Sequence, residues 1–267
     1  MRGRVLIVAG SDSGGGAGIQ ADIKTISMLD GYAASAITAL TAQNTEGVFG
    51  VLPIPPDFIR RQIEVVLDDI GADVIKTGML HDAAVIEAIV AVLQERAAAI
   101  PVVVDPVMIA KGGARLIDPA AIEALKRLLV ARAEIITPNL PEAEALCGAK
   151  IEDVPEMQAA GETLLALGCR AVLVKGGHLP GEIVSDVLVT AAGVRIWESP
   201  RITTRHTHGT GCTLASAIAA GLAQGLGVEG AVDRARNYVQ RAIAGAPGLG
   251  CGHGPLNHAH PLHSDRV

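Results

Sequence analysis

One cysteine of the sequence has neighbours that could bind a phosphate group. Cys212 follows Gly209, Thr210 and Gly211, and an apolar-periodic stretch, residues 214–224, begins shortly after it. A glycine-rich start of this kind leaves backbone N–H groups unpaired in the first turn of a helix, where the positive end of the helix dipole also lies. These donors predict an anion site, and they are expected to lower the pKa of the Cys212 thiol. The competing interpretation, a cysteine that only packs beneath a helix, is adopted for the three others: Cys147, Cys169 and Cys251.

Two acidic residues and a lysine lie at the ends of expected strands. Asp105 follows three consecutive valines, Glu142 lies in the first turn of a helix that follows another strand, and Lys175 closes a buried apolar run. Two carboxylates at neighbouring strand ends could hold Mg²⁺ beside substrate phosphates, although Glu142 could instead only complement a helix dipole. A lysine that closes a buried strand requires an anion, and phosphate is the one expected for Lys175.

A glycine-rich loop follows the first expected strand. Residues 10–18 contain five glycines, more than a tight turn between a strand and a helix needs, which favours a ligand-binding loop. Residues 16–21 also match the dinucleotide pattern G-x-G-x-x-A, but the acidic residue expected about 20 positions later is missing. A Walker A motif is absent from the sequence as well.

The elements that position these residues follow from the hydrophobic pattern. Short β-branched runs predict buried strands at residues 5–9, 35–40, 74–76, 102–105, 134–137 and 171–175. Amphipathic stretches predict helices at residues 18–29, 56–70, 83–98, 119–131, 155–167, 211–224 and 229–244. Residues 184–190 and 194–198 are expected to form a hairpin at one edge of the sheet. This alternation predicts an α/β fold of three layers, with a mostly parallel central sheet and helices on both faces.

Composition excludes several classes of protein. The chain has 267 residues, and its 22 Lys and Arg against 28 Asp and Glu give a net charge of −6, which argues against a nucleic-acid partner. No segment reaches the length of a membrane span, and the four cysteines are too far apart for a zinc or disulfide framework. We therefore expect a cytoplasmic protein with a single domain, residues 1–267, and a flexible tail from about 259 to 267.

The motifs together resemble a known family. From about residue 4 to residue 258 the chain is similar to the hydroxymethylpyrimidine/phosphomethylpyrimidine kinases of the ribokinase-like superfamily. The segments that carry this resemblance are residues 10–24, 38–45, 76–80, 104–108, 137–143, 175–178, 208–213 and 252–258. The resemblance implies a ribokinase-like fold with a reduced lid. It also implies a homodimer that transfers the γ-phosphoryl group of ATP, with Mg²⁺, to the hydroxymethyl group of the thiamine pyrimidine and then to its monophosphate.

The resemblance further implies roles at the substrate and the phosphates. Gln43 should hydrogen-bond the aminopyrimidine, in a pocket that is shaped by Gly10, Ala17 and Met79. Asp105 and Glu142 should face Mg²⁺, and Asn139 and Lys175 should lie near the ATP phosphates. Residues 209–212 should form the anion hole, where Cys212 orients the hydroxyl and takes its proton; sugar and nucleoside kinases of the superfamily carry aspartate at this position.

Three other functions are compatible with parts of the pattern. A pyridoxal-type kinase of the same superfamily shares the Gly-Thr-Gly site, although Gln43 and the glycine-rich loop favour the pyrimidine. A vitamin- or nucleotide-binding protein without catalysis requires Cys212, Asp105 or Lys175 to lie away from the site. A dehydrogenase is disfavoured because the acidic residue that would bind a ribose is missing.

Overall fold

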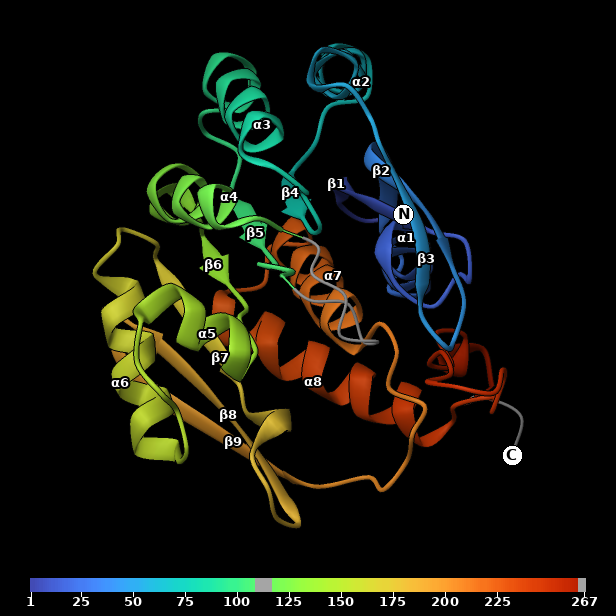
Figure 1. The fold of residues 1–267 in the computed structure, drawn as a ribbon, viewed down its shortest axis with the longest axis vertical. Coiled ribbons are helices and arrows are strands. Elements are labelled where there is room, and N and C mark those ends of the chain that lie inside the picture. Colours follow the sequence, from blue (N-terminus) through green and yellow to red (C-terminus); the bar gives the residue numbers. More distant parts are fainter. Residues whose placement is uncertain (109–116, 264–267) are drawn as a thin grey trace.

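A mixed sheet of nine strands forms the centre of the protein in the computed structural model, which describes residues 1–108 and 117–263 (Figure 1). The strand order is β3-β2-β1-β4-β5-β6-β7-β8-β9. Neighbours from β2 to β7 pair in parallel, whereas β3, β8 and β9 pair antiparallel at the two edges. The strands are β1 (Arg4–Asp12), β2 (Tyr32–Gln43), β3 (Val48–Pro53), β4 (Val74–Thr77), β5 (Val102–Val104), β6 (Ile135–Ile136), β7 (Ala171–Lys175), β8 (Ile183–Thr190) and β9 (Gly193–Pro200).

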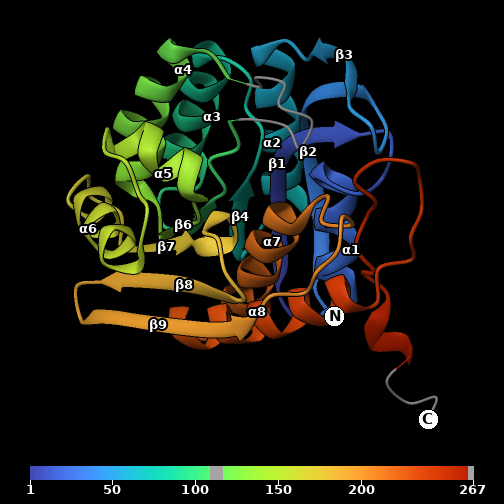
Figure 2. The ribbon, with the colours of Figure 1, turned by 60° about the horizontal axis from the view of Figure 1, so that its bottom comes forward.

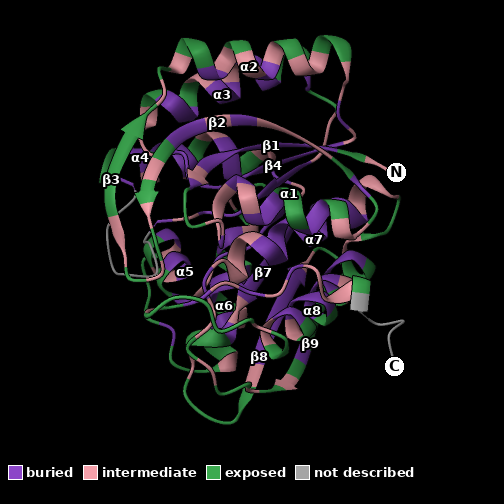
Figure 3. Cartoon of the chain, turned by 90° about the vertical axis from the view of Figure 1, so that its right-hand side faces the viewer, coloured by how far each residue is buried: buried purple, intermediate pink, exposed green. Residues whose placement is uncertain are grey.

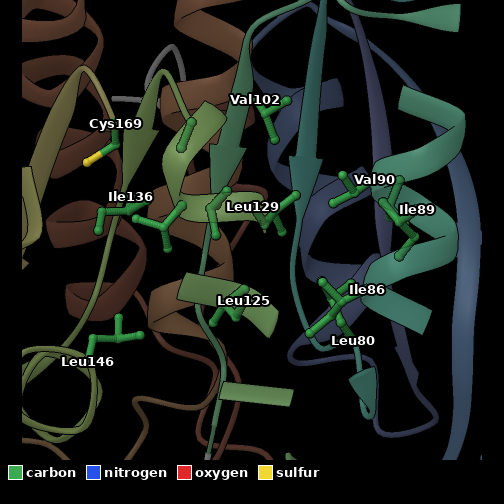
Figure 4. Packing of buried hydrophobic residues seen from close by; sticks show 14 of the residues in the cluster. Leu80, Ile86, Ile89, Val90, Val102, Leu125, Leu129, Ile136, Leu146 and Cys169 are labelled. Carbon is green, nitrogen blue, oxygen red and sulfur yellow. The ribbon is translucent and has the colours of Figure 1, made fainter. Parts of the chain in front are cut away.

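The central strands are largely apolar because this part of the sheet is buried on both faces. Successive side chains of a strand point to opposite faces. In β1, Leu6 and Val8 belong to one hydrophobic cluster, while Val5, Ile7 and Ala9 belong to a second cluster on the other face. Figure 4 shows part of the first cluster, in which side chains of the helices and the strands pack together.

Helices cover the two faces of the sheet in separate layers (Figure 2). Helices α2 to α6 contribute to the first cluster, and α1, α7 and α8 contribute to the second. Exposed residues of α2 face outward and its buried residues face the sheet (Figure 3). The helices are α1 (Gly18–Met28), α2 (Pro56–Asp69), α3 (Ala83–Arg96), α4 (Pro119–Ala124), α5 (Leu140–Cys147), α6 (Val154–Leu165), α7 (Thr210–Ala223) and α8 (Val228–Ala244), with short turns η1 (Leu125–Leu129), η2 (Val130–Arg132), η3 (Gly176–His178) and η4 (His260–His263).

The fold class predicted from the sequence is confirmed: three layers, a mostly parallel sheet and an edge hairpin are all present. The sequence analysis missed the six-residue edge strand β3, which is largely exposed and lacks a buried apolar run. The helix expected at residues 119–131 is confirmed as a continuous helical segment, which is α-helical to Ala124 and continues as a π turn and then a 3-10 turn. In the described part of the chain, no helix is both long and apolar enough to cross a membrane.

The C-terminal segment packs against the second helical layer. The Tyr238 hydroxyl of α8 donates to the carbonyl of His258 (2.6 Å), and His258 Nε2 lies 3.0 Å from the hydroxyl of Thr213 in α7. Further on, His260 Nε2 lies 3.1 Å from the carbonyl of Tyr238. Of the tail expected at residues 259–267, residues 264–267 lie outside the described residues.

His258 makes the stability of the protein sensitive to acid. Burial, assisted by the charges of Lys24 and His260, lowers the pKa of His258 to about 4. The unfolded chain therefore binds a proton below its ordinary value of about 6.5, while the folded protein does not until about 4. The free energy of unfolding should fall by about 3 kcal/mol as the pH drops across this window, with no contribution from His258 above it.

Urea denaturation at several pH values tests this prediction with His258→Asn. The variant loses the Thr213 contact, so its stability at neutral pH is lower, but its slope between pH 6.5 and 4 should be shallower than that of the parent. His253→Asn, at an exposed histidine of the same segment, is the control. Parallel curves for the parent and His258→Asn would contradict the prediction.

Candidate active site

A cavity of about 910 Å³ opens at the carboxyl ends of the parallel strands. Open α/β sheets bind their ligands at this edge, because the loops that follow the strands converge there. All twelve residues that the sequence predicts for the site line this cavity: Gly10, Ala17, Gln43, Met79, Asp105, Asn139, Glu142, Lys175, Gly209, Thr210, Gly211 and Cys212. They come from seven separate segments of the chain, which the parallel sheet brings to one edge.

The start of α7 has the geometry of an anion site. Gly209 adopts a left-handed conformation (φ +82°), and a Cβ there would lie 1.8 Å from the carbonyl oxygen of Gly16. The first α-helical hydrogen bond of α7 is the one from the Thr213 N–H to the Gly209 carbonyl (2.9 Å). The N–H groups of Gly211 and Cys212 precede that bond, so they have no carbonyl one turn earlier in the helix to accept them. A phosphate in the cavity could accept from both.

Burial sets the protonation state of Cys212. Cys212 keeps some accessible surface because it lines the cavity, but the protein packed around its thiol raises the pKa to about 12. The charge of Lys76 opposes this rise, the charges of Asp22 and Asp105 add to it, and the Gly18 N–H donates to the sulfur. The prediction of a lowered pKa is therefore wrong. The helix dipole cannot offset desolvation by a site this enclosed, and the thiol is neutral at physiological pH.

A buried ion pair that the sequence analysis missed lies beneath the cavity. Lys76 of β4 and Asp22 of α1 are both fully buried, and Lys76 Nζ lies 3.0 Å from each carboxylate oxygen of Asp22. The Ser216 hydroxyl of α7 donates to the same carboxylate (2.7 Å). Burial alone would lower the pKa of Lys76, but Asp22, Cys212 and Asp105 raise it above its ordinary value.

The protonation of Asp22 is decided by this geometry. Burial raises the pKa of Asp22, against the opposing effects of Lys76 and Ser216. Lys76 Nζ nevertheless lies at the same distance, 3.0 Å, from both carboxylate oxygens, which is typical of a charged pair. We infer that Asp22 is ionised. Lys76 also lines the cavity, so this buried pair lies directly against the site.

The two predicted metal ligands and Lys175 form one cluster. Lys175 Nζ lies 3.2 Å from Asp105 Oδ1 and 3.9 Å from Glu142 Oε2. Burial raises the pKa of Glu142 to about 7, with a further rise from Asp105 and an opposing effect of Lys175. Lys175 was expected to meet phosphate, and in the described part of the chain it forms ion pairs with these two carboxylates. Among residues 1–108 and 117–263, no group of three His, Cys, Asp or Glu side chains could hold a metal by itself.

Asn139 and Glu142 also begin helix α5. The Glu142 N–H donates to Asn139 Oδ1 (2.9 Å), and the Asn139 N–H donates to Glu142 Oε2 (2.8 Å), which together form a capping box. Glu142 thus also caps the N-terminal end of α5 and complements its dipole, which is the alternative role that the sequence left open. Because the cap fixes the rotamers of both residues, it also holds them at the cavity wall.

The predicted substrate residues line the cavity beside the first loop. A Cβ on Gly10 would lie 2.8 Å from Met79 Cε, so a larger residue there would require the Met79 side chain to shift. The terminal amide of Gln43 contacts His208 (3.2 Å), and His208 Nε2 lies 2.8 Å from Asp12 Oδ2. Asp12 and His208 were not predicted as site residues, although both lie within segments that carry the family resemblance.

The sequence contained a signal for some of the residues that were missed. Lys76 lies within an apolar strand, where a lysine is costly unless it is paired, but we applied that argument only to Lys175. Among the other cysteines, the packing interpretation is confirmed for Cys169, which is buried, and is wrong for Cys251, which is exposed; Cys147 is half-buried.

The sequence matches one family model over nearly its whole length. The phosphomethylpyrimidine kinase model matches residues 12–257. The chain is 47% identical to the hydroxymethylpyrimidine/phosphomethylpyrimidine kinase of Bacillus subtilis, over 96% of this chain and 94% of that protein. It is 54% identical to a thiamine biosynthesis bifunctional protein of Geobacter sulfurreducens, over 96% of this chain but only 52% of that protein. The chain thus spans about half the length of the bifunctional relative.

Solved structures with the same fold include kinases for two ring types. An ADP complex of Bacillus subtilis pyridoxal kinase superposes with a TM-score of 0.89 at 37% identity, covering 97% of this chain and 98% of that one. A phosphomethylpyrimidine kinase from Clostridium difficile superposes with a TM-score of 0.80 at 44% identity, covering 90% and 99%. The two groups of kinases therefore share this fold. The sequence identity of this chain is higher with the two pyrimidine kinases (47% and 44%) than with the pyridoxal kinase (37%).

Proposed function

The chain belongs to the phosphomethylpyrimidine kinase family, and on that premise we propose that it phosphorylates 4-amino-5-hydroxymethyl-2-methylpyrimidine and then the resulting monophosphate. ATP is the phosphoryl donor that a kinase of this family uses. The observation that carries the proposal is the convergence of the twelve predicted residues on one cavity. A non-catalytic binding protein would require Cys212, Asp105 or Lys175 to lie elsewhere, and all three line the cavity.

Phosphoryl transfer depends mainly on positioning and on neutralisation of charge. The hydroxymethyl oxygen attacks the γ-phosphorus, the bond to the bridging oxygen breaks, and ADP leaves. We propose that the N–H groups of Gly211 and Cys212 bind the migrating phosphoryl group. The Cys212 sulfur accepts a hydrogen bond from the attacking hydroxyl, whose proton passes to a phosphoryl oxygen. A neutral thiol can orient the hydroxyl in this way, but it cannot act as a general base.

The carboxylates of Asp105 and Glu142 fit a Mg²⁺ ion. Both are buried at the cavity, and among the described residues Lys175 forms ion pairs with both of them. Mg²⁺ in kinase sites is usually held by one or two carboxylates together with substrate phosphates, which explains why a third protein ligand is not required. When bound, the ion would supply positive charge to the ATP phosphates. Lys175, released from the carboxylates, could then pair with a phosphate oxygen.

The second phosphorylation step gives a prediction for Cys212→Asp. A carboxylate at this position would repel a substrate that already bears phosphate, by about 4 kcal/mol at ~4 Å and an effective dielectric constant of ~20. The positive charges of Lys76, of Lys175 and of a bound Mg²⁺ ion would offset much of this repulsion, so the net effect is smaller. We expect the ratio of kcat/KM for the monophosphate to kcat/KM for the free pyrimidine to fall by about tenfold, since 1.4 kcal/mol corresponds to that factor. An unchanged ratio would contradict the prediction.

ADP release with separate acceptors tests the proposed function. Purified protein with MgATP should turn over the free pyrimidine and, in a separate reaction, its monophosphate. Pyridoxal is the third acceptor, because a pyridoxal kinase shares this fold at a TM-score of 0.89. A kcat/KM for pyridoxal that exceeds the value for the pyrimidine would assign the chain to the second activity instead.

The homodimer and the cytoplasmic location stay predictions. The edge strand β3 exposes Phe49 (72%) and Leu52 (62%), and an uncovered apolar edge of this kind is a common site of association between chains. Light scattering coupled to gel filtration would give the mass in solution.

A further inference from the structure

Asp12 is an ionised carboxylate that only accepts hydrogen bonds. Its Oδ1 accepts from the Gly14 N–H (2.8 Å), and its Oδ2 accepts from the N–H groups of Gly16 (3.1 Å) and Ala17 (2.8 Å). Burial alone would raise the pKa of Asp12, but the hydrogen bonds from His208, Ala17 and Gly14 lower it below its ordinary value. The ring nitrogen of His208 that faces Asp12 must therefore donate a hydrogen bond to it.

This requirement fixes the proton of His208. Its Nε2 lies 2.8 Å from Asp12 Oδ2, so Nε2 must carry a hydrogen. The same Nε2 lies 3.2 Å from the terminal nitrogen of the Gln43 amide. Two N–H donors that face each other make no hydrogen bond. The oxygen and nitrogen of a glutamine amide are distinguished by their hydrogen bonds, so the neighbours of Gln43 decide its orientation.

The other end of the Gln43 amide leads to the same result independently. The terminal oxygen lies 3.2 Å from the hydroxyl of Thr41, and that hydroxyl donates its only hydrogen to the carbonyl of Ser11 over 2.8 Å. Thr41 can therefore only accept from Gln43. With its oxygen toward His208, the amide can share the single Nε2 hydrogen with Asp12 in a three-centre bond, and its NH₂ group can donate to the Thr41 oxygen. This orientation removes the unfavourable contact at each end of the amide.

We propose that the Asp12–His208 pair holds the Gln43 amide in this single orientation and thereby determines which ring the site accepts. Asp12 and His208 act here as positioning residues, since they work through Gln43. The pair is well placed for this role: both residues are buried, and His208 links the loop before α7 to the glycine-rich loop, where a Cβ on Gly16 would lie 2.6 Å from its ring.

The consequence concerns the orientation of the ring, and it rests on the proposed function. The thiamine pyrimidine has an amino donor at C4 and an acceptor at N3, side by side. A fixed amide pairs its oxygen with the amino group and its NH₂ with N3, which also fixes the side on which the hydroxymethyl group at C5 lies. With the amide reversed, the ring would bind turned over, and its C2 methyl group would lie on the side of the hydroxymethyl group.

A substrate pair that differs only in this pattern gives the kinetic test. The 4-oxo analogue of the pyrimidine has an acceptor at C4 and a donor at N3, the reverse of the natural order. The parent should prefer the amino compound strongly, because a site built around one pattern leaves buried groups unpaired with the other. In His208→Phe the ratio of the two kcat/KM values should fall by about tenfold, the equivalent of one hydrogen bond. The matched control His253→Phe, at an exposed histidine, should keep the parental ratio.

Thr41→Val tests the opposite end of the amide and keeps the proposal testable if His208→Phe does not fold. It too should lower the ratio, and the double variant should lower it further than either single variant. An unchanged ratio in the folded variants would overturn the proposal, since a merely structural role would reduce both activities alike.

Nitrogen NMR of the parent gives a readout that needs no turnover. The His208 signals, identified by their loss in His208→Phe, should show a protonated Nε2 at neutral pH. The Gln43 NH₂ protons should show contacts to the Thr41 methyl group. An unprotonated Nε2 would overturn the proposal. If the parent fails to phosphorylate the pyrimidine, the proposed function falls, and the NMR result still decides whether the amide is held as described.

Discussion

Cys212→Ala is expected to lower kcat with the hydroxymethylpyrimidine by about 10²-fold or more. Alanine cannot hold the attacking hydroxyl in place, and a displacement of ~1 Å at the reacting centre costs on the order of 10² in rate. The protein should fold normally, since the substitution removes one sulfur atom at the cavity wall. The KM for ATP should change little. Single-turnover measurements with saturating MgATP would isolate the chemical step. Undiminished turnover would contradict the role of Cys212.

Cys212→Ser distinguishes positioning from base catalysis. A hydroxyl retains the hydrogen bond to the substrate, so this variant should keep far more activity than Cys212→Ala. Because burial raises the pKa of the thiol to about 12, kcat of the parent should not rise through the ordinary thiol value of ~8.5. A rise centred there, and lost in the serine variant, would restore the thiolate as the active species. Cys169→Ala, at a buried cysteine outside the cavity lining, is the matched control.

The largest expected effect on stability is that of Lys76→Met. Methionine has a similar volume, but its substitution leaves the Asp22 carboxylate buried without its ammonium partner. Removal of one partner of a buried ion pair costs about 3–5 kcal/mol. The free energy of unfolding, from urea denaturation at pH 7.5, should fall by that amount.

Two comparisons show that the effect arises from the unpaired charge. The double variant Lys76→Met with Asp22→Leu should be more stable than Lys76→Met alone, because no charge is left buried. Arg96→Met removes one partner of an exposed pair, Arg96–Asp68 (2.9 Å), and should cost less than about 1 kcal/mol. A double variant that is less stable than Lys76→Met alone and than Asp22→Leu alone would show that the ion pair stabilises the fold in its own right.

Much of the site was predictable because strand ends converge in an open α/β sheet. Asp105, Lys175 and Cys212 each lie beside an element whose apolar pattern was readable, and all three line the cavity. What the pattern could not give was the environment of each group. The helix start predicted a thiolate at Cys212, but the pKa depends on desolvation and on three charged residues from other elements.

The layers of the fold, the edge of the sheet that holds the site and twelve of the residues that line it were predictable without the structure, because these follow from local periodicity, from motifs and from the direction of the strands. Tertiary structure alone decided which side chains pair: Lys76 with Asp22, and His208 with Asp12, are separated by 54 and 196 residues. Hydrogen bonds and charges act over a few ångströms. Their partners are therefore set by the packing of distant segments, which no pattern in the chain encodes locally.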